Sequence, residues 1–183
     1  MEQKNRKSVY RYGAEYGRFL GIYLIVMSAL TIAGAHAPFM TLLMAALLPG
    51  FPVILYLVMR RIYREVPYYR TISAMWSIGN ITVICGTLIC ALVSGLWLTF
   101  VEPNFFANYI RNCIATLQSS GQGAQYQEQI DMFKQMLQNG GLPSPMQFVV
   151  SMSWTTAFFG CILSMICGWL LVARERRKAF STT

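Results

Sequence analysis

The side chains that could carry out chemistry are few in this sequence, and they lie far apart. His36 is the only histidine, and no cluster of Cys, Asp or Glu lies near it to complete a metal or haem site. Glu128 and Asp131 are three residues apart on one helical face, a spacing that a solvated helix surface explains better than acid–base chemistry. The chain has no phosphate-binding loop or nucleotide-binding fingerprint. We therefore predict no catalytic residue, no metal site and no cofactor.

The five cysteines indicate packing rather than chemistry. Cys113 lies outside the apolar segments and is unpaired, so it could bond to a second molecule. Its position in an apolar stripe favours burial against a neighbouring helix. The other four lie within long apolar segments, where a cysteine acts as a small packing residue: Cys85, Cys90, Cys161 and Cys167.

The elements that would position these residues are four long uncharged windows. Of the 183 residues, 55% are hydrophobic and 12% are charged, whereas a soluble domain has about 25% charged residues. At about 1.5 Å per residue, each window can cross a hydrocarbon core of about 30 Å, the first with help from its flanks. We predict an all-α integral membrane protein with four transmembrane helices at residues 19–35, 37–59, 74–101 and 146–173.

The positions of Lys and Arg predict the side of the membrane on which each segment lies. All but two of the 15 basic residues are in an amphipathic arm at 1–18, a connection at 60–73 and a tail at 174–183. Because basic segments stay in the cytoplasm, we predict cytoplasmic N and C termini and an outer loop at 102–145. Anionic lipid headgroups explain the net charge of +8, and no nucleic-acid-binding motif accompanies it. The predicted partner of these charges is the lipid bilayer rather than nucleic acid.

The first span has one competing interpretation as a signal peptide. Residues 33–37 resemble an Ala-x-Ala cleavage site. However, Pro38 follows this site directly, and a second apolar span begins at once. We therefore expect the first span to be retained.

Small residues recur every four positions along three of the predicted helices. Such a face lets another helix approach closely, whereas lipid tails gain nothing from it. We predict that spans three and four pack antiparallel through these faces; the glycines at span one could do the same or only provide flexibility. The helix-packing residues are Gly13, Gly17 and Gly21 at span one, Thr82, Gly86, Cys90 and Ser94 in span three, and Thr156, Gly160, Ser164 and Gly168 in span four.

Two further features lie inside the spans. Span two contains Pro49-Gly50-Phe51-Pro52 near its middle, which predicts a kink or break because proline lacks a backbone donor. Asn80 in span three is the only strongly polar side chain well inside a span, and a hydrogen bond between helices explains it better than a substrate contact. No ionisable residue lies inside a span, which argues against an ion-coupled transporter and a voltage sensor.

The residue pattern of the loop at 102–145 predicts that it forms a helical hairpin. Pro103 is suited to begin a helix, and Gly140, Gly141, Pro143 and Pro145 are suited to end one. Between them, two apolar stripes with spacings of three and four residues flank a Gly/Ser-rich break at 119–123. The predicted hairpin core is Phe106, Ile110, Cys113 and Leu117 in the first helix and Tyr126, Ile130, Phe133 and Leu137 in the second.

An ordered set of short motifs extends along nearly the whole chain. They are Tyr16-Gly17 before span one, Tyr68-Tyr69-Arg70 before span three, Glu102-Pro103-Asn104-Phe105-Phe106 and Ser144-Pro145 at the ends of the loop, and Arg176-Arg177-Lys178 after span four. With this pattern the chain resembles the bacterial inner-membrane family catalogued as domain of unknown function four-one-nine-nine, whose members more often have Asn in place of Glu102. The resemblance implies a bacterial inner membrane and a periplasmic loop, and it transfers no catalytic or binding residues.

The sequence leaves three classes of function open. We predict a non-enzymatic inner-membrane protein with a structural or partner-binding role, its partner being another membrane protein or further copies of the same chain. The alternative is a subunit of a small oligomeric transporter or channel, with residues 49–52 and Asn80 as its working parts. The third is a lipid-handling enzyme, whose polar site on the inner side would need Glu15, Arg18, Glu65 and Arg70.

Overall fold

The protein is largely helical over the residues that a computed structural model describes, which are 8–34, 37–119 and 126–181. No strand occurs among these residues, which confirms the predicted all-α fold. A 3₁₀ turn at Pro67–Tyr69 joins two of the helices. The helices are α1 (Val9–Gly34), α2 (Pro38–Leu47), α3 (Gly50–Glu65), α4 (Ile72–Phe100), α5 (Phe105–Ser119), α6 (Gln127–Gln138) and α7 (Pro145–Ser181).

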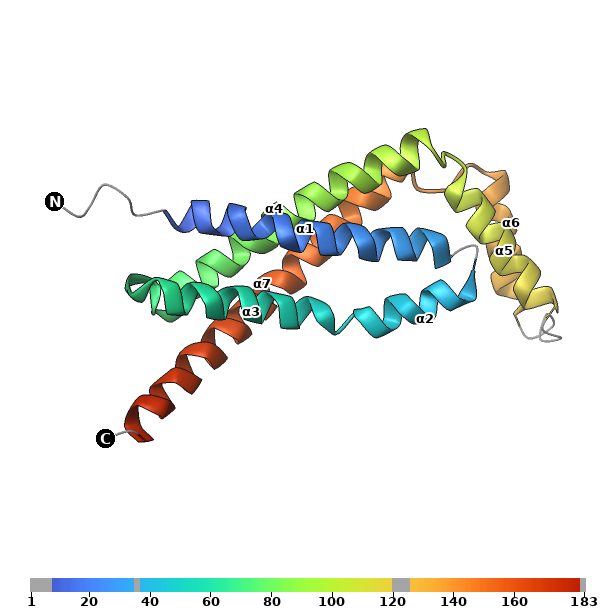
Figure 1. The fold of residues 1–183 in the computed structure, drawn as a ribbon. Helices are drawn as coiled ribbons and strands as arrows, with labels where there is room; N and C mark the ends of the chain where they lie inside the picture. Colours follow the sequence, from blue (N-terminus) through green and yellow to red (C-terminus); the bar gives the residue numbers. More distant parts are fainter. Residues whose placement is uncertain (1–7, 35–36, 120–125, 182–183) are drawn as a thin grey trace.

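Within the described part of the chain, four helical segments are long and apolar enough to cross a membrane, which confirms the four predicted spans. They are α1, the α2–α3 pair from Phe39 to Glu65, α4, and α7 from Pro145 to Arg174. Figure 1 shows both chain ends and the α3–α4 connection at one end of the bundle, here called the basic end. The opposite end carries the α5–α6 hairpin and is called the hairpin end.

Helix α1 begins ten residues earlier than the predicted first span. The backbone N–H of Arg11 donates a hydrogen bond to the Ser8 carbonyl oxygen at 3.0 Å. The Arg11 side chain forms an ion pair with Glu15 at 3.6 Å. The helix then continues unbroken to Gly34. Residues 9–18 are therefore continuous with the spanning helix.

The second span is interrupted at Leu48 and Pro49, between α2 and α3. This break follows from sequence, because Pro49 and Pro52 each lack the N–H that would continue the helical bonding. The Tyr23 hydroxyl of α1 donates to the Leu47 carbonyl oxygen at the end of α2, and so ties the break to α1. Gly50 makes room for this contact, since a Cβ there would lie 2.7 Å from the same hydroxyl oxygen.

The tightly packed core lies toward the basic end. α4 lies between α1 and α7, and Figure 1 shows α4 and α7 crossing the α1 and α2–α3 layer obliquely. At the hairpin end, α2 packs mainly against α1. The buried core residues come from all four spans: Leu20, Leu55, Met59, Ile62, Met75, Ile78, Val83, Cys167 and Leu171.

The three glycines of α1 are all packed against α4, in parallel register. A Cβ on Gly13 would lie 2.5 Å from Ile81, and one on Gly17 would lie 2.6 Å from the Cβ of Cys85. A Cβ on Gly21 would lie 3.3 Å from the Gly86 carbonyl oxygen. The two backbones therefore approach closely, as small-residue faces allow in membrane helices.

Spans three and four do pack together, but the prediction that they do so through the small-residue face of span three is wrong. Gly86 of α4 contacts Gly17 and Gly21 of α1, and Ser94 is bonded to Ser28 of α1. Of the same face, Thr82 is buried and Cys90 is half-buried. This face therefore serves α1 rather than α7.

α7 packs antiparallel against a different face of α4. Gly160 lies against Val83, and Ser164 lies against Gly79, which belonged to no predicted stripe. Gly168 lies at ordinary contact distance from Met75 and from Met59 of α3, and Thr156 is half-buried. α4 thus has small residues on two faces, and each face accepts a different helix.

Substitution of Gly17 tests the α1–α4 contact. We expect Gly17→Ala to destabilise the protein by about 1–3 kcal/mol, as overpacking does, because the new Cβ would meet Cys85 and the Thr82 carbonyl oxygen. Gly95→Ala is the matched control, since its Cβ would meet only side-chain atoms at 3.8 Å or more. We expect it to be neutral or stabilising by about 0.5–1 kcal/mol. Unfolding midpoints in mild detergent would measure both, and equal midpoints would contradict the contact.

Candidate functional site at the hairpin end of the bundle

A crevice separates α1 from α4 at the hairpin end. Its volume is about 480 Å³, within the range of small-ligand sites of about 300–1,000 Å³. The bare glycine face of α1 ends at Gly21, and bulkier side chains line the gap beyond it. The lining residues are Ile25, Ser28, Ala29, Ile32 and Ala33 from α1, Val93, Ser94 and Trp97 from α4, and Glu102 just after α4.

The hydroxyl groups of the two serines in the crevice form a hydrogen bond with each other. Ser28 Oγ and Ser94 Oγ are 2.7 Å apart, and the Cys90 sulfur lies 3.7 Å from Ser94 Oγ. This bond joins α1 to α4 inside the membrane-crossing part of the bundle. The other lining residues from the two helices are apolar, so the crevice suits an apolar group.

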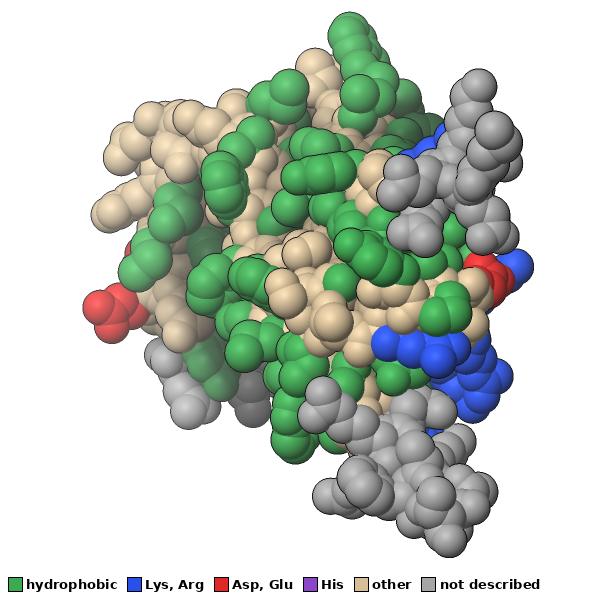
Figure 2. Space-filling view, turned by 90° about the vertical axis from the view of Figure 1, so that its left-hand side faces the viewer, with side chains coloured by type: hydrophobic (Ala, Val, Ile, Leu, Met, Phe, Trp, Pro, Cys, Tyr) green, Lys and Arg blue, Asp and Glu red, His purple; other side chains and the backbone are tan. Residues whose placement is uncertain are grey.

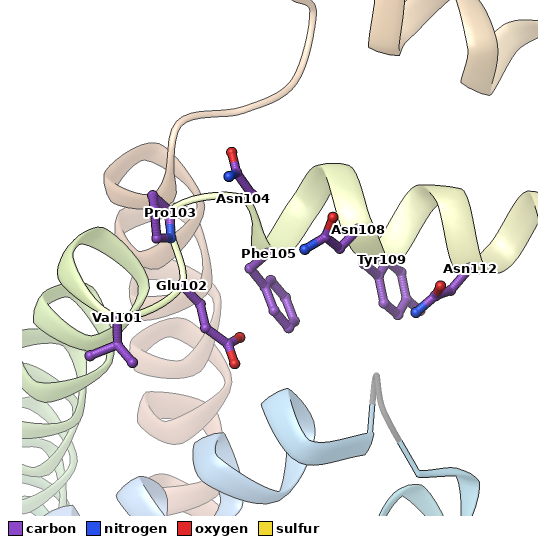
Figure 3. Close-up of a pocket in the computed structure, with 8 residues that line it drawn as sticks. All are labelled: Val101, Glu102, Pro103, Asn104, Phe105, Asn108, Tyr109 and Asn112. Carbon is purple, nitrogen blue, oxygen red and sulfur yellow. The ribbon is translucent and has the colours of Figure 1, made fainter.

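A second, smaller pocket adjoins the crevice at the junction of α4 and α5. Its volume is about 210 Å³, and Glu102 lines both cavities. Figure 3 shows Glu102, Phe105 and Tyr109 pointing toward the end of α1, whereas Asn104 points away. The other residues of this pocket are Val101, Pro103, Asn108 and Asn112.

The backbone between α4 and α5 explains why Glu102 occupies this corner. The N–H groups of Val101 and Glu102 both donate to the Trp97 carbonyl oxygen, at 2.8 and 3.3 Å, and so close the last turn of α4. Pro103 cannot continue the helix. The Glu102 carbonyl oxygen then accepts from Phe105 N at 3.0 Å, and α5 begins in a new direction.

The α5–α6 hairpin lies across the hairpin end, beyond α1 and α2 (Figure 1). Ile130 is fully buried between its helices, as is nearly all of Ile114. Ile114 was not among the predicted core residues, although its position four residues after Ile110 marks the same face. The remaining predicted core residues are half-buried: Phe106, Ile110, Cys113, Leu117, Tyr126, Phe133 and Leu137.

Phe106 joins the hairpin to the bundle. Its ring centroid is 4.9 Å from that of Phe148 in α7, in an edge-to-face arrangement. Phe105 lies against Phe106 at 5.3 Å and stacks on Tyr109 at 6.2 Å. An aromatic ladder thus connects α7 with the wall of the smaller pocket.

Tyr109 is protonated under physiological conditions. Electrostatic interaction with the neighbouring Cys113 sulfur, followed by partial burial and a hydrogen bond to that sulfur, raises the pKa of its hydroxyl above the ordinary value. The hydroxyl therefore stays neutral and is engaged with the Cys113 sulfur at the pocket wall.

Asp131 forms local pairs on the surface of α6. Gln127 donates to Asp131 at 3.3 Å, and Lys134 forms an ion pair with Asp131 at 3.6 Å. Glu128 is exposed on the same helix. These positions agree with a solvated helix surface.

A family profile described as a protein of unknown function (DUF4199) matches residues 15–172. The chain belongs to the DUF4199 family. The match begins in α1, ends in α7, and therefore includes the crevice, the smaller pocket and the hairpin. Searches of curated proteins and of solved structures found no match to this chain.

The structure of the DUF4199 chain bears on two polar residues singled out in the sequence, Asn80 and His36. The Asn80 Oδ1 atom is buried without a hydrogen-bond partner, so the expected bond between helices is not made by this oxygen. Thr87 Oγ1, seven residues further along α4, is also buried without a hydrogen-bond partner. His36 lies outside the described residues, among which no group of three His, Cys, Asp or Glu could hold a metal ion.

The basic end holds the residues that an inner lipid-handling site would need. Figure 2 shows Lys and Arg gathered on one side of this end, beside apolar surface. Arg18 is exposed, and Glu15 pairs with Arg11. Glu65 pairs with Arg61 at 2.8 Å, and Arg70 Nε donates to the Tyr63 carbonyl oxygen at 3.2 Å. The contacts of Glu15 with Arg11, of Glu65 with Arg61 and of Arg70 with Tyr63 are local, along one helix or across the adjoining turn.

Loss of the Phe106 ring tests how the hairpin is held. We expect Phe106→Ala to speed hydrogen exchange of the α5 amides, because an aromatic pair stabilises by about 0.5–1.5 kcal/mol beyond its buried area. Met132→Ala, at a side chain 50% exposed on α6, is the control and should leave exchange unchanged. Equal exchange in the two variants would contradict a docking role for Phe106.

Proposed function

We propose that this DUF4199 protein is a non-enzymatic protein of the bacterial inner membrane that acts by binding a partner protein at its periplasmic hairpin. In this proposal both termini are cytoplasmic, because the basic end carries most of the Lys and Arg residues. The hairpin then lies outside the bilayer, where a partner can reach it.

The observation that carries the proposal is an exposed apolar patch on the hairpin. Met132 and Met136 are 50% and 40% exposed, one helical turn apart on α6. Exposed apolar side chains on the spans face lipid, but these two belong to a hairpin beyond the spans. Methionine is flexible and polarizable, and it is common at surfaces that accept protein partners.

The position of the hairpin also suits a docking role. Phe106 ties α5 to α7, so the patch is carried on a supported element rather than a loose loop. A partner that binds α6 would contact a surface whose orientation is already set, which lowers the entropic cost of binding.

A transporter or channel subunit is the second candidate, and the break at Pro49 favours it. A broken helix in a membrane can serve as a hinge. The unbonded oxygens of Asn80 and Thr87 offer polar groups within the same membrane. The buried hydroxyls of Thr82 and Ser164 bond to their own helices, so a polar path would require several copies of the chain.

Site-specific photo-crosslinking separates the two candidates. With a photoreactive residue at Met132 or Met136, we expect a single adduct whose mass exceeds the chain by that of a different protein. The same residue at Gln138, exposed on another face of α6, is the matched control and should give little product. A double Met132→Gln, Met136→Gln variant should weaken binding by about tenfold or more while keeping its unfolding midpoint.

Two outcomes would overturn the proposal. An adduct with twice the mass of the chain would favour the oligomeric transporter. Equal crosslinking from Met132 and Gln138 would show that the patch does not select a partner.

A further inference from the structure

We propose that the crevice between α1 and α4, together with the pocket above it, binds one phospholipid that carries a primary amine, such as phosphatidylethanolamine. The crevice would hold part of an acyl chain, and the pocket would hold the headgroup. This inference is independent of the protein partner proposed above, because it uses a different surface.

The apolar half of the site has the direction and size of a lipid chain. Its lining extends from Ile25 to Ala33 along α1, about 12 Å at 1.5 Å per residue, and from Val93 to Trp97 along α4. Trp97 is 48% exposed and Val93 is 40% exposed, so the crevice opens to the surroundings of the spans. In a membrane those surroundings are acyl chains, and an apolar crevice of about 480 Å³ favours them over water.

The polar half begins where the apolar half ends. Glu102 lines both cavities, so its carboxylate stands at the boundary between the chain-binding and headgroup-binding parts. The smaller pocket adds the amides of Asn108 and Asn112, and an amide both donates and accepts hydrogen bonds. An apolar cavity that leads directly to a polar one is complementary to an amphiphile with its headgroup at the hairpin end.

Charge at the rim selects the type of headgroup. The Glu102 carboxylate favours an ammonium group and disfavours an anionic lipid without one. Arg111 Nη1 donates to Asn108 Oδ1 at 3.5 Å, so a guanidinium lies beside the same wall and can meet a phosphate. Arg111 does not line the pocket itself, so the Glu102 carboxylate is the charged group in its wall and the group that selects the ammonium of a zwitterionic lipid. A primary ammonium donates hydrogen bonds to a carboxylate, whereas a quaternary ammonium has no N–H to donate.

The fluorescence of Trp97 can report lipid binding in the crevice, because Trp97 lines the crevice and its carbonyl oxygen accepts a hydrogen bond from Glu102 N. The experiment uses the full chain with Trp76, Trp154 and Trp169 changed to Phe, reconstituted in phosphatidylcholine vesicles. Phosphatidylethanolamine, phosphatidylcholine or phosphatidylglycerol with identical brominated acyl chains is then added at equal mole fraction. Bromine quenches tryptophan fluorescence on contact, so quenching measures occupancy beside Trp97.

We expect brominated phosphatidylethanolamine to occupy the Trp97 site about two- to fivefold more than the other two lipids, the selectivity of a partly exposed ion pair. A matched protein that keeps only Trp154, which is 74% exposed on α7, should show no headgroup preference. Glu102→Gln should remove the preference at Trp97 without changing the fold. Ala29→Phe, which fills the crevice, should lower quenching by all three lipids.

Three results would overturn the inference. The first is equal quenching of Trp97 by the three headgroups, and the second is a preference for phosphatidylglycerol. The third is a preference for phosphatidylethanolamine that persists in Glu102→Gln, because the carboxylate would then not be the selecting group.

Discussion

The close contact between the glycine face of α1 and the backbone of α4 determines how the rest of the bundle is arranged. Gly13, Gly17 and Gly21 have no side chains to hold the two helices apart, so van der Waals contact extends over their backbones. The buried core at the basic end joins Leu20 of α1 to apolar residues of α3, α4 and α7. Beyond Gly21 the glycines end, and the crevice opens between the same two helices. One pair of helices thus provides both the stable part and the open part of the molecule.

The break in the second span is coupled to the same helix. Tyr23, two residues after Gly21, donates a hydrogen bond from its hydroxyl to the Leu47 carbonyl oxygen at the break. α3 joins the core at the basic end through Leu55, Met59 and Ile62, whereas α2 packs mainly against α1. The hairpin end therefore has fewer neighbours for α4, which is compatible with a binding site there.

Hydropathy, charge distribution and proline positions were sufficient to predict the four spans, the helix break and the helical hairpin. They could not predict which helix packs on which small-residue face. A stripe of small residues indicates that another helix can approach closely, but not which helix does so. α4 shows the limit: Gly79 belongs to no regular stripe, yet it lies against Ser164 of α7. Glu102 was likewise noted only as part of the motif that opens the loop, since its position between two cavities depends on where α1 ends relative to α4. Local periodicity contains no such information.

The central claim is that α1 and α4 lie side by side in parallel register up to the crevice, and a disulfide tests it most directly. Ser28 Oγ and Ser94 Oγ are 2.7 Å apart, so cysteines at both positions, in a chain whose other five cysteines are replaced, would be within bonding reach. Mild oxidation in membranes followed by alkylation and mass measurement counts the free thiols. The account predicts that neither thiol of the Ser28→Cys, Ser94→Cys protein remains alkylatable until a reductant is added. Alkylation of both thiols after oxidation would contradict it.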